Sequence, residues 1–144
     1  MEVNLNDLVQ NLIDNLAPIA EMKDIELKFK QEDKIELFGD FILIQNAIRN
    51  LIDNALKYSP YEGIITVSIG TSPISFLEIY DQGPGFPPKD LDNLTMRFTR
   101  GQNSNGIVGS GLGLTIAKDV ANAHGAKLQL SNHEKGGACV TLLF

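Results

Sequence analysis

Three glycines stand within five residues in the run Gly109-Ser110-Gly111-Leu112-Gly113, directly before a segment with helical periodicity. The N-terminus of a helix carries unpaired backbone N–H groups and partial positive charge, which attract anions and phosphate above all. Glycine lets an anion come close because no Cβ stands in the way. Taken alone, the run is more typical of an ordinary turn than of a phosphate site, so its interpretation depends on other motifs.

A second motif, Asp81-Gln82-Gly83-Pro84-Gly85, follows directly after a run rich in β-forming residues. An ionised aspartate only accepts hydrogen bonds, and the exocyclic N6 amino group of adenine donates them, so the two groups match. The alternative is a turn in which Asp81 bonds to its own loop. For this motif in isolation, the turn is the better interpretation.

A third motif lies on a predicted helix, where Asn50 and Asn54 are about 40° apart around the axis and point the same way. Amide oxygens are hard ligands that suit Mg²⁺, which shares phosphate oxygens and keeps several waters. Lys57, one turn further, could neutralise phosphate charge. The alternative is an ordinary solvated face, and helical spacing alone does not separate the two.

The apolar pattern predicts the elements that would position these motifs. Helices are expected from Leu5 to Ile19, over 41–58 and from Leu112 to His124, with Asn4 or Asn6 as the first cap. Strands are expected at 25–29, 35–38, 64–69, 76–80, 128–130 and 139–144, and a short helix at 88–94. The mixture of hairpins and helices predicts an α+β fold with a mixed, mostly antiparallel sheet and helices on one face.

Composition narrows the function classes. A length of 144 residues suits a single domain over 1–144, and the net charge of −6 argues against a nucleic-acid binder. The lone Cys139 lies in an apolar run, so we expect it in the core of a protein from a reducing compartment. No stretch is apolar enough to cross a bilayer. Because a helical pattern starts almost at Met1, we expect this chain to be part of a larger protein.

Taken in order, the three motifs resemble the ATP-binding catalytic domain of sensor histidine kinases, over nearly the whole chain. The segment 50–59 is similar to the family's N box, 81–85 to its G1 box and 109–114 to its G2 box. The resemblance implies the Bergerat ATP-binding fold, a two-layer α/β sandwich shared with DNA gyrase B. It also implies ATP and Mg²⁺ as ligands.

The resemblance also assigns roles by position. Asp81, with Gly83 and Gly85, would receive the adenine N6 group, and Tyr58 would lie by the base and sugar. Asn54 would bind Mg²⁺, with Asn50 beside it. The segment 99–109 would form a lid over ATP. The resemblance also implies a group of residues that would contact the phosphates, either in catalysis or in binding: Lys57, Arg100, Gly109, Gly111, Leu112 and Gly113.

Asn50 favours one branch of this family. Relatives that hydrolyse ATP carry glutamate four residues before the metal-binding asparagine, where it activates water as a general base. Asn50 cannot take a proton, so a site of this kind would hold ATP for transfer. His124, at a helix end, and His133, in a turn, do not resemble the family's phosphoacceptor. The acceptor histidine is therefore expected on a separate dimerisation domain, which would pass phosphate to a response regulator.

This reading implies a monomeric, cytoplasmic domain, and two departures from the family pattern qualify it. Thr95 and Met96 replace the usual aromatic and acidic residues of the F box, which bears on docking to the helical domain. Ala138 stands where the family usually has threonine, which implies somewhat weaker nucleotide binding. Two alternatives stay open: a stand-alone ATPase of the same superfamily, or a nucleotide-sensing interaction module.

Overall fold

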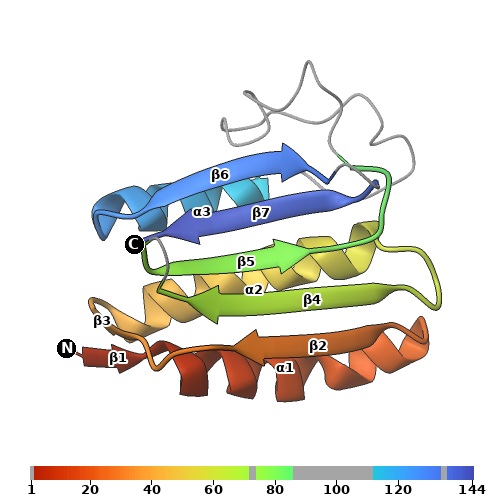
Figure 1. Cartoon of the computed structure of the whole chain (residues 1–144), viewed down its shortest axis with the longest axis horizontal. Coiled ribbons are helices and arrows are strands. Elements are labelled where there is room, and N and C mark those ends of the chain that lie inside the picture. Colours follow the sequence, from red (N-terminus) through yellow and green to blue (C-terminus); the bar gives the residue numbers. More distant parts are fainter. Residues whose placement is uncertain (1, 72–73, 86–111, 134–135) are drawn as a thin grey trace.

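The computed structural model describes residues 2–71, 74–85, 112–133 and 136–144, with the side chains of 112–115 excepted. The short helix expected at 88–94 and the lid expected at 99–109 lie outside these residues. Figure 1 shows the arrangement of the ten described elements, whose bounds are β1 Glu2–Asn4, α1 Leu5–Met22, β2 Glu26–Gln31, β3 Glu36–Phe38, α2 Phe41–Tyr58, β4 Ile64–Gly70, β5 Phe76–Tyr80, α3 Leu112–Ala123, β6 Lys127–Asn132 and β7 Ala138–Leu143.

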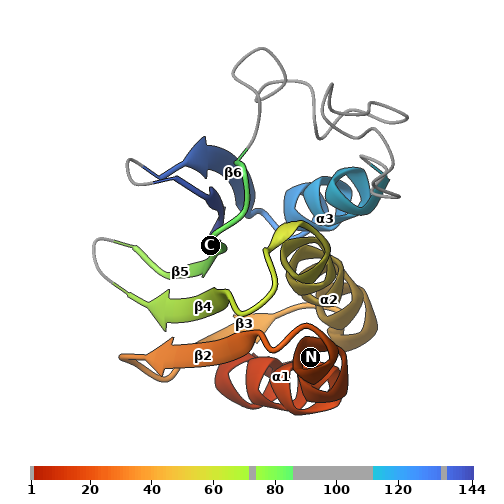
Figure 2. The same cartoon turned by 90° about the vertical axis from the view of Figure 1, so that its right-hand side faces the viewer.

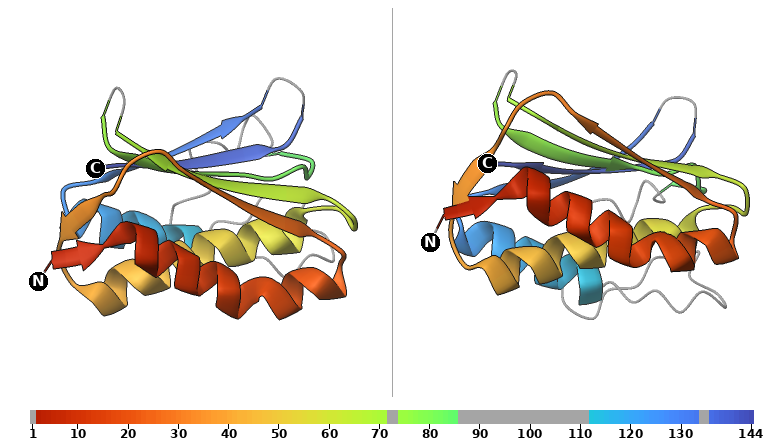
Figure 3. Two further views of the ribbon diagram at one scale, coloured as in Figure 1. Left: turned by 60° about the horizontal axis from the view of Figure 1, so that its bottom comes forward. Right: turned by 90° about the horizontal axis from the view of Figure 1, so that it is seen from below.

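Five strands form one sheet in the order β2-β4-β5-β7-β6. The β2–β4 pair is parallel and the other three pairs are antiparallel. The three described helices all lie on one face of this sheet, and none of them covers the other face (Figures 2 and 3). The expected α+β sandwich, with a mixed, mostly antiparallel sheet and helices on one face, is confirmed. Within the described residues, no helix is long and apolar enough to cross a membrane.

The core lies between the sheet and the helices. Alternate strand residues point to the helical side, so Val67, Ile79 and Val140, which are neighbours across three strands, are all buried. The helices meet them with apolar stripes at helical spacing, as in Ile48, Leu51 and Ile52 of α2. Cys139 follows this alternation on the opposite face of the sheet, where it is half-buried. Its expected place in the core was wrong.

The N-terminal part of the chain adds a small ribbon. β1 pairs antiparallel with β3 in a separate two-stranded sheet, which the sequence analysis did not anticipate. Asn4 is the cap of α1, because its side chain accepts a hydrogen bond from the backbone N–H of Asp7. Asn6 instead fastens α1 to the β2–β3 loop. Its amide nitrogen donates to the carbonyl of Asp33 at 3.0 Å, and its oxygen accepts from the N–H of Ile35 at 2.9 Å.

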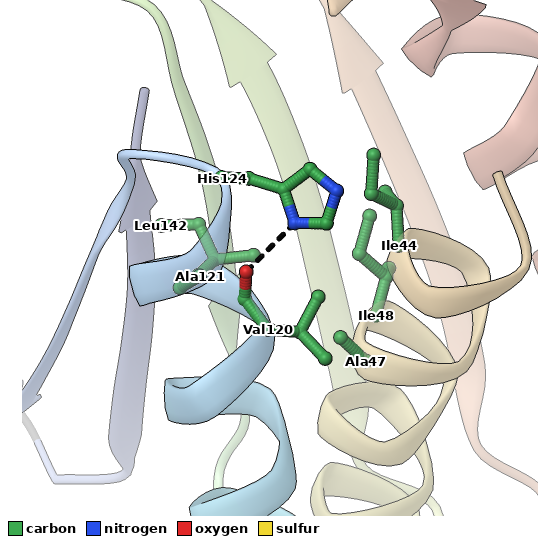
Figure 4. Close-up of a pocket in the computed structure, with 7 residues that line it drawn as sticks. All are labelled: Ile44, Ala47, Ile48, Val120, Ala121, His124 and Leu142. Atoms are coloured by element: carbon green, nitrogen blue, oxygen red, sulfur yellow. Dashed lines mark hydrogen bonds between the residues drawn. The ribbon is translucent and has the colours of Figure 1, made fainter. Parts of the chain in front are cut away.

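His124 joins the end of α3 to the start of α2. Its Nε2 accepts from the backbone N–H of Asp40 at 3.1 Å, and its Nδ1 lies 2.8 Å from the carbonyl oxygen of Val120. A small apolar pocket lies beside the ring, between the two helices and β7 (Figure 4). Since the end of α3 meets the start of α2, the two helices run antiparallel. His124 is therefore a structural residue, which fits its position at a helix end.

We predict that Asn6→Ala lowers the free energy of unfolding by about 1–3 kcal/mol, because it leaves the half-buried N–H of Ile35 without its acceptor. Asn4→Ala removes only a helix cap and should cost about 1 kcal/mol. Urea unfolding followed by circular dichroism measures both variants. A smaller loss for Asn6→Ala than for Asn4→Ala would contradict this role of Asn6.

Candidate functional site

The side chain of Asp81 lies directly after β5 and is 5% exposed. Its Oδ1 accepts two backbone hydrogen bonds, from Gly83 at 2.8 Å and from Ala138 at 3.2 Å. The bond from Gly83 is the local turn that the sequence offered as the alternative interpretation. In the described part of the chain Oδ2 accepts no hydrogen bond. The turn and a ligand contact are therefore compatible, because the turn uses one carboxylate oxygen and leaves the other.

Burial raises the pKa of Asp81 above its ordinary value of 3.8, and the hydrogen bonds from Gly83 and Ala138 oppose this rise. The direction shows that desolvation of the charged form outweighs the two N–H donors. A third donor, brought by a ligand to Oδ2, would favour the ionised form. The site is thus chemically suited to a group that donates a hydrogen bond.

Two glycines let other segments come close to Asp81. A Cβ on Gly83 would lie 2.5 Å from the carbonyl oxygen of Tyr58, so the loop after β5 packs directly on the end of α2. A Cβ on Gly137, whose φ is 103°, would collide with the carbonyl oxygen of Asp81. The turn between β6 and β7 is therefore part of the site. Gly85, with φ of 80°, lies against the side chain of Asn132.

Helix α2 presents its amides at the edge of its buried stripe. Asn50 and Asn54 are half-buried, whereas Arg49 and Lys57 are exposed. Tyr58, the last residue of the helix, is half-buried, and burial raises the pKa of its phenol, which favours the neutral form. The fully solvated face that the sequence left open as an alternative does not describe Asn50 and Asn54.

The first turn of α3 lies close to the part of α2 that carries these amides. Ala47 of α2 lines the contact with α3, and Asn54 lies about 20° from it around the helix axis, on the same side. From the His124–Asp40 contact, α3 extends about 18 Å back to Leu112, and α2 extends about 21 Å forward to Asn54. The first turn of α3, with Leu112 and Gly113, therefore lies beside the half of α2 that carries Asn50 and Asn54.

The remaining expected site residues are not described by the structure. Arg100, Gly109 and Gly111, the proposed lid at 99–109, and Thr95 and Met96 of the F box all lie outside the described residues. Their roles stay predictions. The described members of the set come together at one end of the sandwich, where β5 and α2 end, β7 begins, and α3 begins alongside α2 (Figure 1).

The backbone contributions to this site were not predicted from the sequence. The N–H of Ala138 reaches Asp81 only because β5 and β7 pair with Tyr80 opposite Cys139. The signal was present in the Gly136-Gly137 turn, but its meaning depends on a pairing between residues almost 60 positions apart. The sequence drew attention to Ala138 because its side chain lacks the hydroxyl that the family usually has there. Its backbone N–H contacts the carboxylate, and this contact does not depend on the side chain. His133, expected in a turn, is exposed and stacks on Tyr80 with ring centroids 4.5 Å apart.

The chain resembles known sensor kinases in sequence. It is 39% identical to the sensor histidine kinase HprS of Escherichia coli K12 over 123 residues, which cover 85% of this chain and 27% of HprS. It is 33% identical to the sensor protein QseC of the same organism over 139 residues, covering 94% of this chain and 30% of QseC. The chain thus spans about a third or less of the length of these curated relatives.

Solved structures and a family model agree with this likeness. The mycobacterial sensor histidine kinase MprB superposes with a TM-score of 0.88 at 27% identity, over all of this chain and 97% of that one. The solved cytoplasmic segment of QseC shares the fold, with a TM-score of 0.77 at 23% identity over 76% of its length. The model of the histidine kinase-, DNA gyrase B- and HSP90-like ATPases matches residues 39–144, and the chain belongs to this family.

Proposed function

We propose that this chain binds Mg-ATP and donates the γ-phosphoryl group to a histidine on a separate dimerisation domain. The observation that carries the proposal is the buried Asp81 carboxylate, held through Oδ1 by Gly83 and Ala138. Its Oδ2 is suited to accept from adenine N6, because an ionised carboxylate is an acceptor only. The family matches and the sensor-kinase relatives support the same conclusion.

The other half of the nucleotide would lie along α2 and the first turn of α3. The amide oxygens of Asn54 and Asn50 suit Mg²⁺, which takes hard oxygen ligands together with phosphate oxygens. Bound there, the ion would offset phosphate charge. Lys57 and Arg100 would neutralise further charge, and Tyr58 would lie by the base and sugar. The N-terminus of α3, at Leu112 and Gly113, is the end of a helix that attracts phosphate.

Asn50 supports transfer in preference to hydrolysis. An amide cannot accept a proton from water, so the chain lacks at this position the base that hydrolysing relatives use. In the proposed transfer, a ring nitrogen of the acceptor histidine forms a bond to the γ-phosphorus. The bond to the bridging oxygen breaks, ADP keeps that electron pair, and the other ring nitrogen releases its proton. Positioning and charge stabilisation account for most of such a reaction.

The proposed partners follow from the relatives. The chain would work with the histidine-bearing dimerisation domain of a longer kinase, and phosphate would pass on to a response regulator. We propose a cytoplasmic location, since the solved segment of QseC that shares this fold is cytoplasmic. The net charge of −6 does not suit a nucleic-acid partner. We expect the isolated chain to be a monomer.

The deciding experiment is calorimetric titration of the chain with ADP, with and without Mg²⁺, followed by phosphotransfer from ATP to the dimerisation domain of a sensor kinase. We expect saturable binding strengthened by Mg²⁺ and label on the acceptor histidine. Asn54→Ala should abolish the effect of Mg²⁺, whereas Asn46→Ala, an exposed asparagine two turns earlier on α2, should leave it unchanged.

Fast ATP turnover by the chain alone would instead indicate a stand-alone ATPase. Nucleotide binding without phosphotransfer to any acceptor domain would favour a nucleotide-sensing module. Absence of binding at millimolar ADP would contradict the whole assignment.

We predict that nucleotide affinity falls as the pH is lowered, beginning above the ordinary aspartate pKa of 3.8. Burial raises the pKa of Asp81, so this carboxylate takes up a proton at a higher pH than an exposed one and then loses acceptor capacity for adenine N6. Titration of ADP into the wild type and Asp81→Asn between pH 7 and pH 4.5 measures this. Protonation of ADP itself affects the wild type and the variant equally. A pH profile of the same shape for both proteins would therefore contradict the role of Asp81.

We predict that Gly137→Ala weakens ADP binding at least about tenfold, because the added methyl would push the β6–β7 turn away from Asp81 and break the bond from Ala138. Gly136→Ala is the matched control. Gly136 also has positive φ, 94°, but its Cβ would meet nothing within 4 Å. Both changes strain the backbone, so equal losses of affinity would show that the contact with Asp81 is unimportant.

A further inference from the structure

One lysine outside the three motifs holds the end of α2. Lys23 follows α1, and its Nζ donates to the carbonyl oxygens of Leu56 and Ser59, each at 2.8 Å. It also lies 3.5 Å from the carbonyl oxygen of Lys57. The side chain is half-buried, and its ammonium lies 5.4 Å from the centroid of the Tyr61 ring. Lys23, 33 positions before Leu56, therefore caps the C-terminal end of the helix that carries the N box.

These carbonyls have a general need for a donor. The last carbonyls of a helix have no partner within the helix and form the negative end of its dipole. A lysine ammonium both satisfies them and offsets the charge. At the end of α2 this matters for function, because a negative end would repel the phosphates of a nucleotide bound nearby. Lys23 adds a positive charge there without using Lys57.

The carbonyls that Lys23 contacts bracket two proposed site residues. Leu56 precedes and Ser59 follows the pair Lys57 and Tyr58. Ser59 is 3% exposed, so its carbonyl is held inside the molecule. The carbonyl of Tyr58 in turn is the group on which Gly83 packs. A shift at the end of α2 would therefore pass directly to the loop that holds Asp81.

The backbone of Lys23 takes part in the same junction. Its carbonyl oxygen accepts a hydrogen bond of 2.9 Å from the N–H of Glu62, which lies in the turn after α2. Among the described residues, the two non-glycine residues with positive φ are Asp24 at 53° and Glu62 at 64°, one in each of the turns joined here. Strained backbone of this kind persists only where its surroundings fix it. The junction is thus held in one geometry by contacts from both sides.

We propose that Lys23 is a positioning residue of the nucleotide site. It fixes the end of α2 so that Lys57 and Tyr58 face the ligand and the Gly83 loop keeps Asp81 in place. This inference rests on the proposed nucleotide-binding function. It extends the site to the turn after α1, which lies outside the segment 39–144 that the family model matches.

The test is Lys23→Met, which keeps the length of the side chain and removes its charge and donors. We expect ADP with Mg²⁺ to bind about tenfold more weakly, since hydrogen bonds from charged groups are among the stronger ones. Asn6→Ala is the matched control, because it also cuts side-chain ties between α1 and a loop, at the opposite end of α1. It should lose stability and keep its affinity.

Hydrogen exchange in the free chain provides a readout that does not need a ligand. Lys23→Met should speed exchange in the segments 55–63 and 81–85, and Asn6→Ala should not. If Lys23→Met does not fold, Lys23→Gln replaces it, since this variant loses the charge but keeps an amide donor. For Lys23→Gln we expect about threefold weaker binding.

Wild-type affinity and unchanged exchange at 81–85 in a folded Lys23 variant would overturn the inference while leaving the proposed function in place. A wild-type chain that binds no nucleotide would overturn both, and the two failures are therefore distinguishable.

Discussion

A buried carboxylate must have hydrogen-bond partners, and this requirement governs the end of the sandwich where the site lies. Asp81 obtains one donor locally, from Gly83, and a second from Ala138 at the start of β7. The second donor exists only if β5 and β7 pair in the observed register and if the turn before β7 can come close. Gly137 permits that approach. The geometry of Asp81, at the adenine end of the proposed site, therefore depends on the formation of the C-terminal hairpin.

Helix α2 connects this end of the sandwich to the rest of the fold. Its apolar stripe packs on the sheet, and both of its ends are held by side chains from other elements. His124 accepts from the N–H of its N-cap, Asp40, and Lys23 donates to the carbonyls at its end. A helix fixed at both ends keeps the amides of Asn50 and Asn54 at a constant position relative to Asp81. Such rigidity suits the proposed phosphoryl transfer, which depends mainly on positioning.

Local patterns were sufficient to predict much of this molecule, and pairings distant in sequence were not. The helix expected over 41–58 is the observed α2, because Asp40, the apolar spacing and Ser59-Pro60 all act within a few residues. The parallel pairing of β2 with β4 and the ribbon of β1 and β3 depend on partners brought together by α1 and α2. Cys139 was misplaced because an apolar run does not say which residues face the helices. Lys23 was overlooked for a similar reason, since its acceptors lie more than 30 positions away, at the end of α2 and directly after it.

The raised pKa of Asp81 ties stability to function. Burial disfavours the ionised form of this carboxylate more than the hydrogen bonds from Gly83 and Ala138 favour it, so keeping it charged in the fold has a cost. In the proposed function, a ligand that donates to Oδ2 would offset part of this cost. Gly83 and Gly137 also give up side-chain packing, since a Cβ at either position would collide with a backbone carbonyl oxygen, that of Tyr58 or that of Asp81.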